Sequence, residues 1–259
     1  MDGNRESASR KGSNANTQGE RMTALVGLLA LIPAWTDADP TLDDVLQKGF
    51  KDAQFSIVVV QADQRELAKI NKDFGASYRF KTSEATIKEP FKLRLSGKVD
   101  DTEILFIVNG TTQWIRVPRA NISQKNELAK SPGKRQTMMD FGVLTPSLFD
   151  ELFSAKFVRV DRATGDYVFD LTFQKPKYVD TTRFRLWIDP KLRYTKRREW
   201  YNRVGELMAT FLYERPVTQG GATLPTKVTV RNVDGKLAGV TEYRSVAINR
   251  GLSDSLFSP

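Results

Sequence analysis

The residues that carry most enzyme chemistry are missing from this sequence. Its 259 residues include no His and no Cys, so a Ser-His-Asp triad, a Cys-His pair, a histidine base and metal sites built from histidine or thiolate are excluded. Carboxylate pairs remain, as at Asp43 and Asp44. These two follow each other in the first turn of an expected helix, where adjacent side chains point in different directions. We therefore expect a protein that is not an enzyme, with no catalytic residue, no metal ligand and no cofactor.

A dense run of positive charge at residues 183–203 is the second chemical feature of the chain. Three of its arginines, Arg197, Arg198 and Arg203, are predicted to contact an anionic surface such as a membrane. Trp and Tyr residues in the same run could stack on nucleic-acid bases, but the export signal described below argues against nucleic acid as a partner. The alternative is a solvated outer sheet face, where positive charge discourages pairing between sheet edges.

The first 38 residues have the composition of a leader that precedes a secreted domain. Residues 1–21 are polar, without any apolar period. An apolar run of about a dozen residues then begins at Met22, and Thr36 and Ala38 are small residues suited to a cleavage site. A buried N-terminal helix is the alternative, and Met22 is a second candidate for the first residue. We expect residues 1–38 to be a disordered N-terminus plus signal peptide, the mature protein to be periplasmic, and residues 39–259 to form a single domain.

Helical spacing is confined to three short stretches. Residues 42–50 place apolar side chains on one helical face after Asp39-Pro40. A second helix is predicted over residues 64–74, and Thr145-Pro146 marks the beginning of a third. Residues 118–142 show no period and are predicted to form a long loop.

Two-residue alternation governs most of the remaining chain. Leu93 and Leu95 alternate with Lys92 and Arg94, which is typical of a strand with one apolar face. Asn109-Gly110 separates two further strands and predicts a hairpin, because both residues tolerate the positive φ of a type I′ turn. More strands are predicted at 167–173, 183–188, 192–201, 206–213, 226–232 and 237–248.

So many one-sided strands need to close on themselves or be covered, and few helices are available as cover. The fold class we predict is therefore mainly β (α+β): a large curved antiparallel sheet forming an incomplete barrel wrapped around a few short helices, with apolar space between them.

The order of these segments resembles a known family. The leader and first helix are followed by KEPFKLRL, the hairpin ILFIVNGTTQWIRVP, the segment DFGVLTPSLFDELF and the terminal LPTKVTVRNVDGKLAGVTEYRSVAINRGLSDSLF. Over residues 42–257 this order resembles the LolA-like outer-membrane lipoprotein carrier and sorting proteins. The motifs are diffuse strand patterns rather than a chemical signature. The resemblance implies a periplasmic half-barrel with a helical lid, whose hydrophobic cavity shelters the acyl chains of lipoproteins.

Under this interpretation the apolar strand faces become candidates for lipid binding. Sequence alone does not separate a ligand wall from ordinary core. What favours a ligand wall is the number of one-sided strands relative to the helices that could cover them. The predicted lipid-binding residues are Leu93, Leu95, Phe106, Trp114, Phe169, Leu171, Phe173, Phe184, Leu186 and Ile188.

The leading hypothesis is therefore a periplasmic carrier or chaperone for lipoproteins or other acylated lipid cargo, with a transfer partner at the inner or outer membrane. Burial of each methylene contributes about 0.8 kcal/mol. Exposing a chain of about sixteen carbons to water therefore costs roughly 12 kcal/mol, which a cavity can remove. The first alternative is an envelope sensor of the same fold that binds lipid or a membrane-protein partner. An enzyme acting through carboxylates and a nucleic-acid-binding protein are the remaining alternatives.

Overall fold

The computed structural model describes residues 39–175 and 177–259, and the predicted leader in residues 1–38 lies outside this range. Residues Asp39–Pro259 form one compact unit. Its strands in chain order are β1 (Asp52–Ala62), β2 (Thr82–Lys88), β3 (Lys92–Val99), β4 (Thr102–Asn109), β5 (Thr112–Val117), β6 (Ile122–Glu127), β7 (Phe153–Val160), β8 (Tyr167–Phe173), β9 (Arg183–Ile188), β10 (Thr195–Tyr201), β11 (Leu207–Gln219), β12 (Ala222–Asn232) and β13 (Leu237–Ile248).

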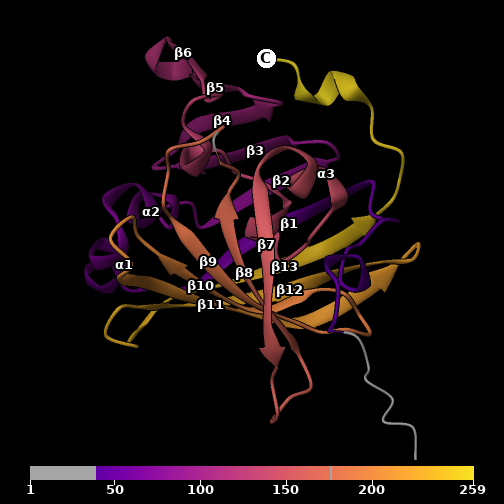
Figure 1. Ribbon diagram of the computed structural model, residues 1–259. Helices are drawn as coiled ribbons and strands as arrows, with labels where there is room; N and C mark the ends of the chain where they lie inside the picture. Colours follow the sequence, from indigo (N-terminus) through magenta and orange to yellow (C-terminus); the bar gives the residue numbers. More distant parts are fainter. Residues whose placement is uncertain (1–38, 176) are drawn as a thin grey trace, which may run out of the picture. The chain divides into compact units, whose positions relative to one another are not determined.

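Within the described residues all thirteen strands belong to one sheet, whose order is β6-β5-β4-β3-β2-β1-β13-β12-β11-β10-β9-β8-β7. Figure 1 shows the strands fanning around a common region. The end strands β6 and β7 do not pair with each other, so the sheet is an incomplete barrel, as predicted. Strand β1 pairs with β13, and this pairing joins a first arm (β1–β6) to a second arm (β7–β13).

The helices are short, as predicted. They are α1 (Gln64–Ile70), α2 (Lys72–Ser77) and α3 (Pro146–Glu151), with single 3-10 turns at η1 (Leu42–Asp44), η2 (Pro118–Ala120), η3 (Pro132–Lys134), η4 (Met138–Phe141) and η5 (Asp254–Phe257). The helix predicted after Thr145-Pro146 is confirmed as α3. Pro146 lies in its first turn, where the missing N–H would have no helical partner anyway.

The helix predicted over residues 42–50 is wrong. Only the 3-10 turn η1 forms, and the chain then turns while still burying Val45, Leu46 and Phe50. The cause is a long-range contact: the amide side chain of Gln47 donates to the backbone oxygen of Thr223 at 2.8 Å and accepts from its backbone N–H at 2.7 Å. These two bonds bind the segment to β12, so its apolar residues are buried without a helix.

The helix predicted over residues 64–74 is divided into α1 and α2. Asn71 between them has an extended backbone, and its side-chain oxygen accepts from the backbone N–H of Phe74 at 3.2 Å. An asparagine that bonds the backbone three residues later begins a new helix instead of continuing the old one. The division lets Leu67 and Ile70 of α1 and Phe74 of α2 pack on the same cluster.

Two turn predictions also change in detail. Residues 118–142 were predicted as a loop, but they contain β6, which extends the first arm by an edge strand paired with β5.

The hairpin at Asn109-Gly110 is confirmed, since β4 and β5 are antiparallel neighbours. Its pairing places Asn109 opposite Thr112, however, so Gly110 and Thr111 are the loop residues, and of these Gly110 alone has a positive φ. The turn is therefore not type I′ around Asn109-Gly110.

The core consists of two adjacent clusters that share the contact residue Trp200. The central cluster is built mainly from β1, β2, β11, β12 and β13 under α1 and α2, and includes Phe55, Leu67, Ile87, Phe211 and Val230. The β7–β9 cluster lies under α3 and includes Leu148, Phe153, Phe169, Leu171 and Phe184. On the other face of the first arm, the C-terminal turn η5 packs on β3 and β4 and buries Phe257 completely.

Candidate functional site

The structure brings six predicted lipid-binding residues together on one face of β8 and β9. Phe169 pairs with Leu186 and Leu171 pairs with Phe184, so the alternating residues of the two strands face the same side. All six belong to the β7–β9 cluster and are between 0% and 9% exposed. The six are Phe169, Leu171, Phe173, Phe184, Leu186 and Ile188.

Aromatic rings from the edge strand β7 extend this face. The ring of Phe153 stacks on that of Phe173 with centroids 5.0 Å apart and meets Phe184 edge-on at 5.9 Å. Phe157, further along β7, meets Phe169 edge-on at 5.5 Å. The result is a wide aromatic surface, and it has no second sheet packed against it within the described residues.

A single helical segment covers the surface instead. Leu144, Leu148 and Leu152, at and around α3, are fully buried against it, and Val45 and Leu46 from the N-terminal turn complete the cover. In the structure, protein side chains therefore fill the space over this face of β8 and β9.

Polar contacts at the rim of the aromatic surface hold α3 in place. The hydroxyls of Thr145 and Ser147 both donate to the carboxylate of Glu89, at 2.9 Å and 2.5 Å. Burial raises the pKa of Glu89, and the two hydroxyl hydrogen bonds oppose that rise. At the helix backbone, the side chain of Gln174 donates to the oxygen of Phe149.

An arginine that the sequence did not single out anchors the other end of α3. The guanidinium of Arg135 forms an ion pair with Glu151 at 2.6 Å and lies 3.8 Å above the ring of Phe91. The Arg135 side chain is only 1% exposed, yet its Nε and Nη2 have no hydrogen-bond partner. No sequence signal marks this residue, because it stands in a stretch without any period.

The other predicted lipid-binding residues lie on the first arm. Leu93 belongs to the central cluster, and Leu95 and Phe106 pair with each other and pack against that cluster. Trp114 pairs with Ile107, which alternates with Phe106 and so faces the opposite side of the sheet. Trp114 is thus on the other face from the remaining nine residues and is not kept as part of the site.

Of the three predicted anionic-surface residues, Arg198 faces inward. It forms an ion pair with Asp140 at 2.7 Å, and its guanidinium lies 4.2 Å from the ring centre of Phe211 and 5.8 Å from that of Phe184. These rings belong to the two different clusters, so Arg198 is a buried cation between them. Its predicted contact with an anionic surface is therefore not kept.

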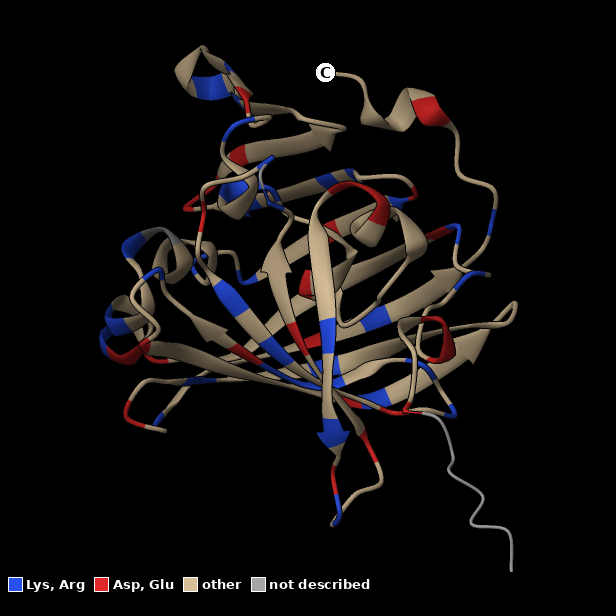
Figure 2. Ribbon diagram, viewed as in Figure 1, with Lys and Arg blue, Asp and Glu red and all other residues tan. Residues whose placement is uncertain are grey.

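Arg197 and Arg203 have exposed side chains. Arg197 forms an ion pair with Glu199 and packs 4.4 Å from the ring centre of Trp187, whereas Arg203 is 73% exposed and pairs with Asp180 at 3.1 Å. Figure 2 shows Lys and Arg positions along several strands of the second arm. Contact of these two residues with an anionic surface remains a prediction.

In the part of the chain that the structure describes, no group of three or more acidic residues could hold a metal ion. A helix long and apolar enough to cross a membrane is likewise not found among these residues.

Comparison with known proteins places the chain in a family. A family model described as "Uncharacterized protein" matches residues 97–259, which run from the end of β3 to the end of the sequence. The chain belongs to this family. None of the curated proteins matches the sequence.

Three solved structures share the fold. A LolA superfamily protein from Nitrosomonas europaea is similar with a TM-score of 0.57 and 17% identity, over 85% of this chain and 98% of that one. A domain from Vibrio parahaemolyticus, described as an outer membrane lipoprotein-sorting protein, has a TM-score of 0.51 and 12% identity, over 82% and 91%. A DUF1329 family protein from Desulfovibrio piger has a TM-score of 0.50 and 14% identity, over 82% and 91%. The fold is LolA-like, as the sequence predicts.

Proposed function

We propose that this protein is a carrier or binding protein for lipid acyl chains, and that its cargo is lipoproteins on their way to the outer membrane. The LolA-like fold supports a binding role. The observation that carries the proposal is the aromatic face of β7–β9, which is covered by the segment around α3 and by the N-terminal turn instead of a second sheet. A cover of this kind can move aside without breaking the pairing between named strands, although the backbone bonds of Leu144 to Gln47 and of Leu152 to Gln174 have to open.

Movement of α3 would replace one set of apolar contacts by another. Leu144, Leu148 and Leu152 would leave the aromatic face, and an acyl chain would take their place. Each buried methylene of the cargo contributes about 0.8 kcal/mol, so a chain of about sixteen carbons offsets the loss of three leucine side chains, at about 2 kcal/mol each. The free-energy change of this exchange is therefore favourable for a long acyl chain and unfavourable for a short one.

The location of the protein is part of the proposal. The apolar run that begins at Met22 and the small residues at Thr36 and Ala38 support export, removal of residues 1–38 and a periplasmic mature domain of residues 39–259. N-terminal sequencing of the protein from an envelope fraction tests this step, and recovery of the intact N-terminus from the cytosol would contradict it.

A paired titration tests acyl binding. We expect a dansyl-labelled undecanoic acid to bind the unaltered protein, and Leu171→Asn to weaken that binding about tenfold or more, because an amide would face the chain. Val230→Asn, an equally buried apolar-to-polar change in the central cluster, serves as the matched control. Urea unfolding is measured on the same samples.

The control decides the interpretation. If Val230→Asn lowers the free energy of unfolding as much as Leu171→Asn but leaves probe binding intact, the β8–β9 face binds the acyl chain. If the two variants lose stability and probe binding in equal proportion, the face is closed core and the proposal fails.

A further inference from the structure

A pocket of about 330 Å³ lies on the second arm, away from α3. Thr210 and Leu212 of β11 line it and alternate with Phe211, whose ring belongs to the central cluster. Successive residues of a strand face opposite sides of its sheet. The pocket is therefore on the outer face of the sheet, separate from the face proposed to bind acyl chains.

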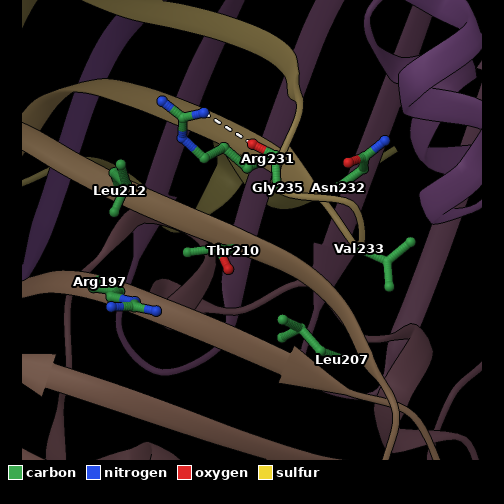
Figure 3. A pocket seen from close by; sticks show the side chains of 8 residues that line it. All are labelled: Arg197, Leu207, Thr210, Leu212, Arg231, Asn232, Val233 and Gly235. Atoms are coloured by element: carbon green, nitrogen blue, oxygen red, sulfur yellow. Dashed lines mark hydrogen bonds between the residues drawn. The ribbon is translucent and has the colours of Figure 1, made fainter.

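The walls of the pocket come from three neighbouring strands and one turn. Arg197 of β10 pairs with Leu212 of β11, and Thr210 of β11 pairs with Arg231 of β12. In Figure 3, Thr210 lies between the two arginines, and Leu207 and Val233 lie beside it on the side away from Leu212.

Apolar side chains at this position are unusual for an outer face. The solvent side of an antiparallel sheet normally carries polar residues, yet Leu207 and Leu212 are only partly buried and Val233 in the β12–β13 turn is 50% exposed. Together with Thr210 they make an apolar floor, and none of the residues lining the pocket carries a carboxylate.

The two arginines differ in how far their charge is already neutralised. Arg197 is paired with Glu199. Arg231 makes no salt bridge with any described residue, and its guanidinium donates one hydrogen bond, from Nη1 to the backbone oxygen of Gly235 at 2.9 Å (Figure 3). A guanidinium has five N–H donors in a planar fork that suits carboxylate and phosphate oxygens. Arg231 thus offers both uncompensated charge and free donors beside an apolar floor.

From this arrangement we propose a second binding site for an amphiphile with an anionic head and one apolar chain. The carboxylate or phosphate head binds Arg231, with the Thr210 hydroxyl within the same pocket, and the first part of the chain lies on Leu207, Leu212 and Val233. Ligand pockets usually measure about 300–1,000 Å³, so this one suits a head with a short length of single chain and not a complete diacyl lipid. Free fatty acids and the headgroups of anionic membrane lipids share this chemistry.

Amide NMR during titration with sodium decanoate tests the site. We expect shifts at Thr210, Leu212 and Val233, and about tenfold weaker binding in Arg231→Gln, because the head loses its counter-charge. Arg244→Gln, an exposed arginine of β13 that does not line the pocket, is the control for charge and leaves the affinity unchanged. Val233→Ser weakens binding several-fold, while Val204→Ser in the β10–β11 turn does not.

Further ligands identify what the site selects. Decanol, which lacks the charge, and inorganic phosphate, which lacks the chain, should each bind at least tenfold more weakly than decanoate. Co-sedimentation with phosphatidylglycerol vesicles that depends on Arg231 identifies a membrane lipid as the source of the head, whereas decanoate binding without vesicle binding identifies a free amphiphile.

Three results overturn the proposal. Equal decanoate affinity in Arg231→Gln and the unaltered protein removes the role of the arginine. Equal affinity for phosphate and decanoate makes the pocket a plain anion site. Decanoate shifts confined to β8, β9 and α3 assign the amphiphile to the inner face, which leaves the proposed carrier function standing while this site fails.

Discussion

The two helical covers of the sheet are held in different ways. Helix α1 over the central cluster is capped by its own sequence, since Asp63 accepts from the backbone N–H groups of Arg65 and Glu66 at 3.0 Å and 3.1 Å. Helix α3 over the β7–β9 cluster has no side-chain cap; the hydroxyl of Thr145, its N-cap residue, donates to Glu89 instead.

This difference separates a cover whose first turn is capped by the residue before it from one whose N-cap residue bonds a distant side chain. An N-cap stabilises a helix locally by about 1 kcal/mol, whereas α3 relies on Glu89, Arg135 and Gln174, which all lie outside it. The cover over the β7–β9 cluster is thus the one that lacks a local cap and is held at both ends by side chains outside the helix.

Leucine truncations should show the largest difference in stability between the two covers. We expect Leu67→Ala in α1 to lower the free energy of unfolding by about 4 kcal/mol and Leu148→Ala in α3 by about 2 kcal/mol, both within the usual range of roughly 2–5 kcal/mol for buried leucines. Both side chains are fully buried, but α3 can shift to fill the space that is left. Urea unfolding measures the two losses, and equal values would mean that the covers are equally fixed.

The ion pair at the end of α3 should give the next largest effect. Glu151→Gln leaves the buried guanidinium of Arg135 without its counter-charge. We expect a loss of about 2 kcal/mol, below the roughly 3–5 kcal/mol of a fully buried pair because the Glu151 side chain is 34% exposed, and faster hydrogen exchange in α3. Lys69→Gln in α1, where the lysine side chain is 34% exposed, should cost less than about 1 kcal/mol.

Arg135→Met provides the complementary variant. It removes the charge together with the two N–H groups that have no partner, so it should cost less stability than Glu151→Gln. A cost as large as that of Glu151→Gln would show that α3 needs the guanidinium itself.

Acidification should change the stability of the two covers in opposite directions. We expect this effect to be the smallest of the three. Hydrogen bonding to Lys69 lowers the pKa of Glu66 in α1, so its stabilising contribution is present at neutral pH and is lost as pH falls through the folded-state pKa. Burial raises the pKa of Glu89, so the folded state takes up a proton more readily than the unfolded chain, and this group adds stability as pH falls through its folded-state pKa.

Hydrogen exchange at pH 7 and near pH 4 measures both trends. In the Glu151→Gln background, where the Arg135 ion pair cannot contribute, we expect protection to fall in α1 and to hold or rise in α3 as the pH falls, and Glu89→Gln to abolish the trend in α3. Parallel loss of protection in both helices would contradict the assignment of Glu89.

Much of the fold and part of the site follow from local sequence. Two-residue alternation predicts the faces of β8 and β9 correctly, because both strands pair in register without a bulge along their contact. Strand β1 escaped prediction for the opposite reason. Ile57 to Val60 are all apolar, so the run shows no alternation although Ser56 to Val59 pair regularly with β13, and bulges on either side of this stretch interrupt the pattern further.

Other features depend on partners that local sequence does not reveal. The turn after η1 depends on Gln47 meeting Thr223, 176 positions away. The burial of Arg135 depends on Phe91 and Glu151 meeting it in space. Trp114 was assigned to the wrong face because aromatic character says nothing about register, and only its pairing with Ile107 decides the side.

The pairing of β1 with β13 also bears on how the chain acquires its fold. Ala53 pairs with Ile248, so the bond between the two arms joins residues from nearly opposite ends of the domain. During synthesis β1 has no permanent neighbour on this side until the last strand has emerged, and contacts of such long sequence separation form slowly. The joint between the two arms therefore forms only after β13 has been synthesised, and until then the first arm has no partner on its β1 side.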